Sequence, residues 1–69
     1  MEAEHELFVF LLENYACAKN RPTGEVLREW DEHGITQEIF DNYWIYHTEA
    51  LTNAYMDIDS LLATGKHAY

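Results

Sequence analysis

The sequence predicts a small all-α protein, a bundle of three to four helices with short loops that forms one domain over residues 1–69. Three observations lead to this prediction. Apolar side chains recur at intervals of three and four residues, the period of one helix face. One proline and three glycines divide the chain into helix-sized pieces. Two domains do not fit, because domains rarely run much below about 50 residues.

The first predicted helix covers residues 2–19. Its apolar face consists of Phe8, Leu11, Leu12 and Tyr15. A strand over residues 7–12 is the alternative, because short apolar runs fit both structures. The length of the segment and its alanines favour the helix. We expect it to end by about Asn20, because the residue before a proline avoids the α region and Pro22 follows closely.

The second predicted helix covers residues 24–33, with Thr23 as its N-cap. Val26, Leu27 and Trp30 form a narrow apolar stripe along it. Gly34 is placed to adopt a left-handed conformation just after the helix. Ile35 would then pack on Trp30, as in a Schellman ending.

The third predicted helix covers residues 37–47 and is apolar on nearly all sides, which is typical of a helix in a core or an interface. For residues 48–55 we expect a turn or a loop. The last predicted helix covers residues 57–64, with Asp57 as its N-cap and Gly65 at its end. A longer helix that starts near Ala54 is the alternative. We expect residues 66–69 to fray.

The charge excludes several classes of protein. Thirteen acidic side chains face four basic ones, for a net charge of -9, so direct binding to a nucleic-acid backbone is not expected. The hydrophobic content of 48% argues against disorder. The apolar run 7–12 is far shorter than the roughly 20 residues of a membrane span. An acidic start without a signal-peptide pattern and a single cysteine indicate a cytoplasmic protein.

No catalytic, cofactor-binding or metal-binding residues are predicted. The four histidines lack metal-site spacing, and Cys17, near a helix C-terminus, is expected to be a buried structural thiol. His47 is expected to be structural. The competing enzyme hypothesis pairs His47 with Asp57 or Asp59 as acid and base, but so short a chain has little room for a dry pocket.

The aromatic residues indicate a protein-binding surface, because Trp and Tyr dominate the energetics of interfaces. The candidate interface residues are Trp44, Tyr46, Tyr43, Phe40, Trp30 and His47. The acidic surface favours a partner protein with a basic surface. Alternatively, the acidic surface serves only to keep the protein soluble. The apolar third helix also predicts a symmetric homodimer.

The order of several short motifs resembles a family of small all-helical bacterial proteins, a domain of unknown function. The motifs are Glu6-Leu7-Phe8-Val9-Phe10-Leu11-Leu12-Glu13-Asn14-Tyr15, Lys19-Asn20, Gly24-Glu25-Val26-Leu27, Gly34-Ile35, Ile39-Phe40-Asp41-Asn42-Tyr43, His47-Thr48 and Asp57-Ile58-Asp59. The resemblance covers roughly residues 6 to 62. Family members are often encoded beside a protein that resembles ADP-ribosyltransferases, which implies an accessory or antitoxin-like role and no catalytic residues. The chain departs from the family at Glu49-Ala50-Leu51, where a glycine is expected.

The leading hypothesis is therefore a non-enzymatic, acidic, protein-binding module that is antitoxin-like or regulates a neighbouring enzyme. The alternative is a phage-type inhibitor that imitates the charge of nucleic acid and occupies a host nuclease or regulator. That alternative predicts binding that weakens steeply as salt rises.

Overall fold

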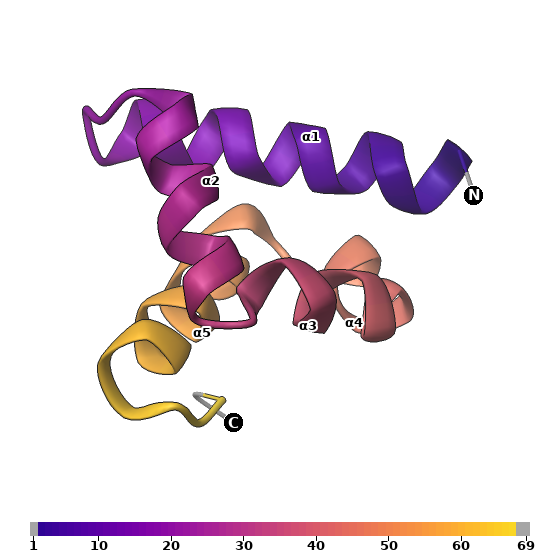
Figure 1. Cartoon of the computed structure of the whole chain (residues 1–69). Coiled ribbons are helices and arrows are strands. Elements are labelled where there is room, and N and C mark those ends of the chain that lie inside the picture. Colours follow the sequence, from indigo (N-terminus) through magenta and orange to yellow (C-terminus); the bar gives the residue numbers. More distant parts are fainter. Residues whose placement is uncertain (1, 68–69) are drawn as a thin grey trace.

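The computed structural model describes residues 2–67, which form five α-helices and no strand (Figure 1). The helices are α1 (Glu2–Ala18), α2 (Thr23–Glu32), α3 (Ile35–Asp41), α4 (Tyr43–Thr48) and α5 (Leu51–Thr64). The all-α prediction is confirmed, although the described part of the chain contains more helices than the three to four predicted. No described helix is long and apolar enough to cross a membrane.

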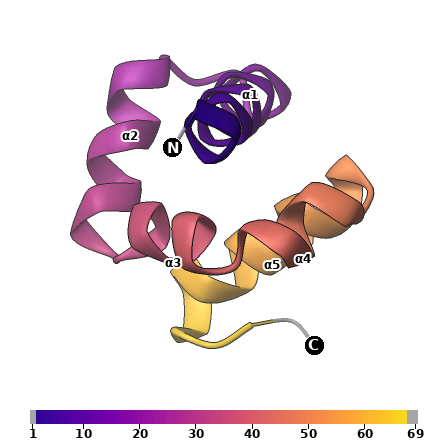
Figure 2. The ribbon, with the colours of Figure 1, turned by 90° about the vertical axis from the view of Figure 1, so that its right-hand side faces the viewer.

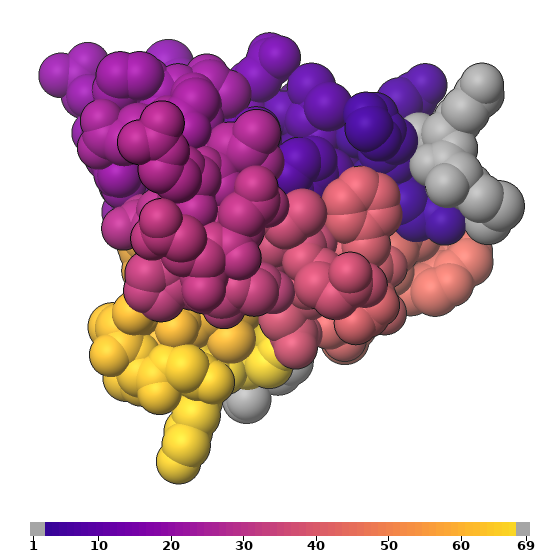
Figure 3. Space-filling view, in the orientation of Figure 1, coloured from indigo at the N-terminus to yellow at the C-terminus, as the bar shows by residue number. Residues whose placement is uncertain are grey.

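Helix α1 is the longest element, and the other helices gather on one side of it. In Figure 1, α2 leaves the far end of α1, and α3 and α4 then run back beneath it. Figure 2 looks along α1 and shows α2 and α3 bending around it, with α5 below. The space-filling view shows α2 and α3 packed without a gap between α1 and the end of α5 (Figure 3).

The end of α1 confirms the predicted boundary. Asn20 has a left-handed φ of 56°. The Arg21 amide donates to the Ala16 carbonyl at 2.9 Å, and the Asn20 amide donates to the Cys17 carbonyl at 3.1 Å. These two bonds form a Schellman motif, in which asparagine tolerates the left-handed position that glycine usually takes.

The predicted turn after α2 is also present. Gly34 has a φ of 72°, and α3 begins at the next residue, Ile35. Ile35 and Trp30 both lie in the core. The predicted cap is wrong, because Thr23 is the first helical residue and extended Pro22 stands at the N-cap without a side-chain bond. Proline suits this start because its missing N–H is not needed there.

The third predicted helix is in fact two, because the chain breaks at Asn42 (φ -111°, ψ 33°). The Asn42 side-chain amide donates to the Glu38 carbonyl at 2.9 Å and to Glu38 Oε2 at 2.7 Å. Asparagine side chains compete with the regular backbone bonds in this way. As a result α4 leaves α3 in a new direction.

The last predicted helix is too short, because α5 begins at Leu51 instead of residue 57. Leu51, Ala54 and Tyr55 lie at helical spacing before Ile58 and pack on or within the core, so burial extends the helix backwards. Asp57 is therefore not a cap but a fully buried residue in mid-helix.

One apolar core joins the helices. Its buried members are Phe8, Leu11, Leu12, Tyr15, Ala16, Val26, Trp30, Ile35, Ile39, Tyr46, Ala54, Ile58 and Leu61. Trp30 lies at the centre, with its ring centroid 5.8 Å from that of Phe8 and 5.4 Å from that of Tyr15, both in edge-on contacts. Such contacts add to the stabilisation by burial alone.

Candidate functional site

Helix α4 carries an exposed cluster of aromatic rings. The Tyr43 and His47 rings stack with centroids 4.9 Å apart. Trp44 lies edge-on to both, at 5.4 Å from each, and 75% of its surface is exposed. We call Tyr43, Trp44 and His47 the aromatic cluster. On this short helix Tyr46 is buried in the core, whereas Trp44 and His47 are exposed and Tyr43 is half-buried.

The structure divides the six predicted interface residues into three groups. The aromatic cluster holds Tyr43, Trp44 and His47. Trp30 and Tyr46 are buried, because Trp30 packs against α1 and the Tyr46 hydroxyl has an internal partner. Phe40 is half-buried and stacks on Phe8 with centroids 5.2 Å apart. The surface available to a partner is thus narrower than the sequence suggested.

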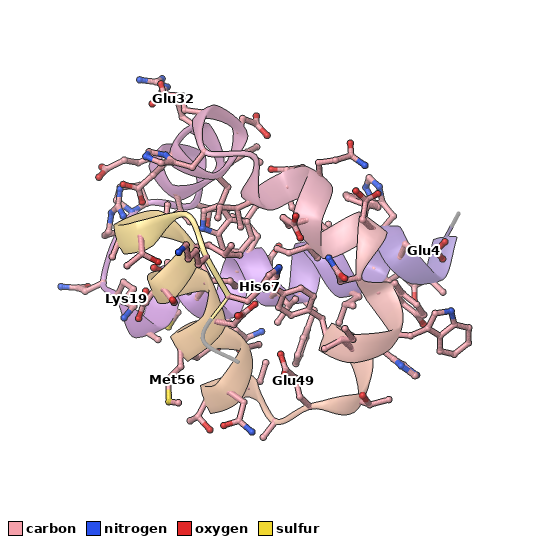
Figure 4. The ribbon with its side chains drawn as sticks, turned by 90° about the horizontal axis from the view of Figure 1, so that it is seen from below. Glu4, Lys19, Glu32, Glu49, Met56 and His67 are labelled. Atoms are coloured by element: carbon pink, nitrogen blue, oxygen red, sulfur yellow. The ribbon has the colours of Figure 1, made fainter. Side chains whose placement is uncertain are left out.

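The aromatic cluster lies in a region without lysine or arginine. The four basic residues are Lys19, Arg21, Arg28 and Lys66, so residues 29–65 contain none. Lys19 and Arg21 are neutralised in ion pairs with acidic side chains, at 2.8 to 2.9 Å. Figure 4 places Glu4 and Lys19 at opposite ends of α1, with Glu4 at the end beside α4. The charge is therefore uneven, and α4 lies at the acidic end.

A second group of side chains lies beneath α4. Asp57 is fully buried and accepts a hydrogen bond from the Tyr46 hydroxyl. Its Oδ2 also lies 2.7 Å from His67 Nδ1, and His67 Nε2 lies 3.1 Å from Glu38 Oε2. Asn42 donates to the same Glu38 oxygen. We call these five residues the polar cluster. It ties α3, α4 and α5 to the segment 65–67.

The environment of the polar cluster changes the acidity of its members. The hydrogen bond to Asp57 is the main cause that raises the pKa of His67. The charge of Asp57 and the contact with Glu38 raise it further, against the effect of burial. Loss of hydration raises the pKa of nearby Glu49, and the charge of Asp57 adds to this. Glu49 Oε1 is buried without a hydrogen-bond partner among the described residues. Figure 4 shows Glu49 and His67 in the same part of the molecule.

The polar cluster is not predicted by the sequence. His67 was expected to fray, but Lys66 and His67 are bonded back onto the helices, while residues 68–69 lie outside the described residues. One signal was present: Asp57 shares a helix face with the apolar Ala54, Ile58 and Leu61. A carboxylate on a buried face requires a partner, since an isolated buried charge is very costly.

The other predicted functional residues have different surroundings. His47 stacks on the surface, and the imidazole that contacts Asp57 is that of His67. Asp59 bonds with Tyr15 at 2.6 Å and Lys19 at 2.8 Å. Cys17 is exposed rather than buried, because it lies opposite the face that packs. Within residues 2–67 there is no pocket and no group of three ligands placed for a metal ion.

Comparison with known families gives one finding for this chain. Residues 6–64 match the model of a family described as protein of unknown function (DUF3791). Searches of curated proteins and of solved structures gave no match. The matched region includes all of α2, α3, α4 and α5, and with them the aromatic cluster, whereas His67 lies just beyond it. Since the match spans most of the sequence, the chain belongs to the DUF3791 family.

Proposed function

We propose that the protein is a non-enzymatic binding module that docks through the aromatic cluster of α4 onto a partner protein with a basic surface. The observation that carries this proposal is the exposure of Trp44 within three mutually contacting rings. Single exposed apolar residues are ordinary on protein surfaces. A clustered set that includes a tryptophan is typical of an interface anchor.

The arrangement of the three rings favours a role in binding a partner. Tyr43, Trp44 and His47 restrain one another on a helix, so little side-chain freedom is left to lose when a partner covers them. Immobilising a flexible side chain at an interface costs about 0.5–1.5 kcal/mol, and a pre-ordered cluster avoids part of that cost. The outward Ile45, 41% exposed, adds apolar surface on the same short helix.

The charge supports a basic partner. An acidic surface attracts a cationic partner over distances of about 10 Å at moderate salt, which speeds the encounter. The sequence also predicts a homodimer, but two copies would each bring a net charge of -9 and would repel one another. A different protein of opposite charge fits this surface better than a second copy does.

The most concrete form of the proposal is an antitoxin-like or regulatory role in the cytoplasm. This form rests on the family resemblance, which implies a neighbouring gene for a protein similar to ADP-ribosyltransferases. A small acidic module could cover the surface through which such an enzyme meets its anionic substrates. The phage-type inhibitor is the second candidate, and the acidic end of the molecule is the observation that favours it.

The test is a binding measurement against the purified product of the adjoining gene, and a pull-down from the host at low and high salt. We expect Trp44→Ala to weaken binding by roughly 30-fold or more, as for an interface hot spot. Met56→Ala is the matched control, because Met56 is 60% exposed on α5 and lies outside the aromatic cluster.

Equal binding by wild type and Trp44→Ala would exclude the aromatic cluster as the anchor. A partner that is lost entirely at high salt, with both variants alike, would instead support imitation of nucleic-acid charge. A monomeric protein with no partner at either salt concentration would leave solubility as the role of the acidic surface.

A further inference from the structure

The segment 65–67 turns back onto the helices instead of leaving them. Gly65, with a φ of 76°, ends α5, and its amide donates to the Leu61 carbonyl at 2.9 Å. The Ser60 hydroxyl then donates to the Lys66 carbonyl at 2.7 Å, and the Lys66 amide donates to Thr64 Oγ1 at 3.2 Å. This turn brings the His67 ring back over the middle of α5.

His67 then lies between two carboxylates from different helices. Its Nδ1 is 2.7 Å from Oδ2 of Asp57 on α5, and its Nε2 is 3.1 Å from Oε2 of Glu38 on α3. The His67 side chain is 27% exposed and that of Asp57 only 1%. The His67 ring therefore covers the buried carboxylate of Asp57.

This geometry favours one additional proton in the polar cluster. A neutral imidazole donates from one nitrogen only, and the lone pair of the other nitrogen would face a carboxylate oxygen. Both contacts become favourable when the ring is an imidazolium, or when Asp57 holds the proton and donates it to the ring. Either way the His67–Asp57 pair must bind one proton more than it would with both groups deprotonated, and that proton is shared.

We propose that the segment 65–67 is a proton-dependent latch, closed over Asp57 while the His67–Asp57 pair holds this proton and open once the proton is lost. The inference concerns a site on the opposite side of Tyr46 from the aromatic cluster and does not depend on the proposed function. When the latch opens, the link between α3 and α5 through His67 is broken, and the Asp57 carboxylate loses its cover.

The groups around His67 determine the direction of the pH effect. Glu38 faces it from α3, Tyr46 from α4, Glu49 from the connection between α4 and α5, and Asp57 from α5. The hydrogen bond and charge of Asp57, and then those of Glu38, raise the pKa of His67 in the folded state against the effect of burial. A raised histidine pKa stabilises the closed form fully below the unfolded pKa of about 6.5, and this stabilisation is lost as pH rises through the folded pKa.

The experiment follows both the ring and the backbone. Long-range ¹H–¹⁵N NMR of the His67 ring would give its protonation at each pH, and amide hydrogen exchange at Lys66 and His67 would report opening of the latch. We expect the ring to titrate above the ordinary histidine value. We also expect amide exchange, corrected for its intrinsic pH dependence, to accelerate by roughly ten-fold or more across the same pH range, because a charged hydrogen bond is lost.

Glu38→Gln tests the mechanism without removing the histidine. It should move the His67 titration toward its ordinary value and open the latch at lower pH. His47→Gln is the matched control, because His47 lies on the surface of α4 away from the latch. His67→Gln should remove the pH step in exchange altogether, and its fold is checked by circular dichroism.

Two results would overturn the proposal. One is an ordinary titration of His67 that Glu38→Gln does not move. The other is exchange at Lys66 and His67 that is unchanged between acidic and alkaline pH while the ring loses its proton, since that would mean that the segment stays in place without the ionic contacts.

Discussion

Two buried regions of the molecule differ in their chemistry. Between α1 and α2, Trp30 is surrounded by Phe8, Tyr15 and aliphatic side chains, and its indole N–H has no hydrogen-bond partner among the described residues. Between α4 and α5, Asp57 is just as deeply buried, but it is held by the Tyr46 hydroxyl and the His67 ring. Both regions exclude water, but only the second contains a buried carboxylate in contact with a histidine.

The two regions should differ in how much they stabilise the fold and in whether that stabilisation depends on pH. Apolar burial contributes about 25 cal/mol per Å² and does not vary with pH. A buried charge network is stabilising only while every member has its partner, and breaking one member is costly. The first region should therefore hold the fold, and the second should set the conditions under which α3, α4 and α5 stay together.

The largest effect is expected from truncation of the apolar region. Trp30→Ala should cost about 3–5 kcal/mol, because Trp30 is fully buried. A core in a chain of this size supplies only about 3–5 kcal/mol in total. We therefore expect the variant to be largely unfolded at 25 °C, as measured by circular dichroism and urea titration.

Trp44→Ala is the matched control for this prediction. The same chemical change at a side chain that is 75% exposed should alter stability by less than about 0.5 kcal/mol. If both variants lost similar stability, the contrast between core and surface tryptophan would be wrong, and the α4 cluster would have to pack on the fold.

A smaller effect is expected in the polar region, and it should depend on pH. Asp57→Asn keeps the shape of the side chain and an acceptor for Tyr46 but removes the charge beside His67. The substitution should lower the free energy of unfolding by about 1.5–3 kcal/mol at pH 6. This decrease should be smaller at a pH above the raised pKa of His67, where the wild-type ring has itself lost its proton. Urea titrations at the two pH values measure the difference.

Asp59→Asn is the control for Asp57→Asn. Asp59 bonds with Tyr15 and Lys19, but its side chain is 43% exposed, so its removal should cost less than about 1 kcal/mol. An Asp57→Asn loss that is the same at both pH values would show that His67 contributes nothing that depends on its proton.

The sequence predicted the apolar region well and the polar region poorly, for a physical reason. The spacing of Phe8, Leu11 and Tyr15, the stripe that ends at Trp30, and the left-handed Gly34 are local signals that burial then reinforces. The family resemblance was also correct. These features depend on neighbours within one or two helical turns, which periodicity records.

The polar cluster depends on contacts that no local pattern contains. His67 meets Glu38 across 29 positions of the sequence. The break at Asn42 lies inside an apolar pattern that reads as one continuous helix. The exposed aromatic cluster was predicted in part, since Tyr43, Trp44 and His47 were among the candidates. Tyr43, Trp44 and His47 share one side of α4 by helical spacing, whereas Tyr46 lies on the buried side with Ile35 and Ile39.

The smallest effect separates two roles for Glu49, whose carboxylate lies beside the polar cluster. Burial, and then the charge of Asp57, raise the pKa of Glu49, so the folded state binds this proton more tightly than the unfolded state. Wild-type stability should therefore fall as pH rises through the raised pKa, and Glu49→Gln should remove that fall. Relative to wild type, we expect Glu49→Gln to raise the free energy of unfolding by about 1 kcal/mol or less near pH 7 and not at all below about pH 4. Glu13→Gln, on the exposed face of α1, is the control.

A lower free energy of unfolding for Glu49→Gln near pH 7 would reverse the interpretation. The Glu49 charge would then be a third acidic partner of His67, and its attraction to the imidazolium would outweigh the cost of its burial.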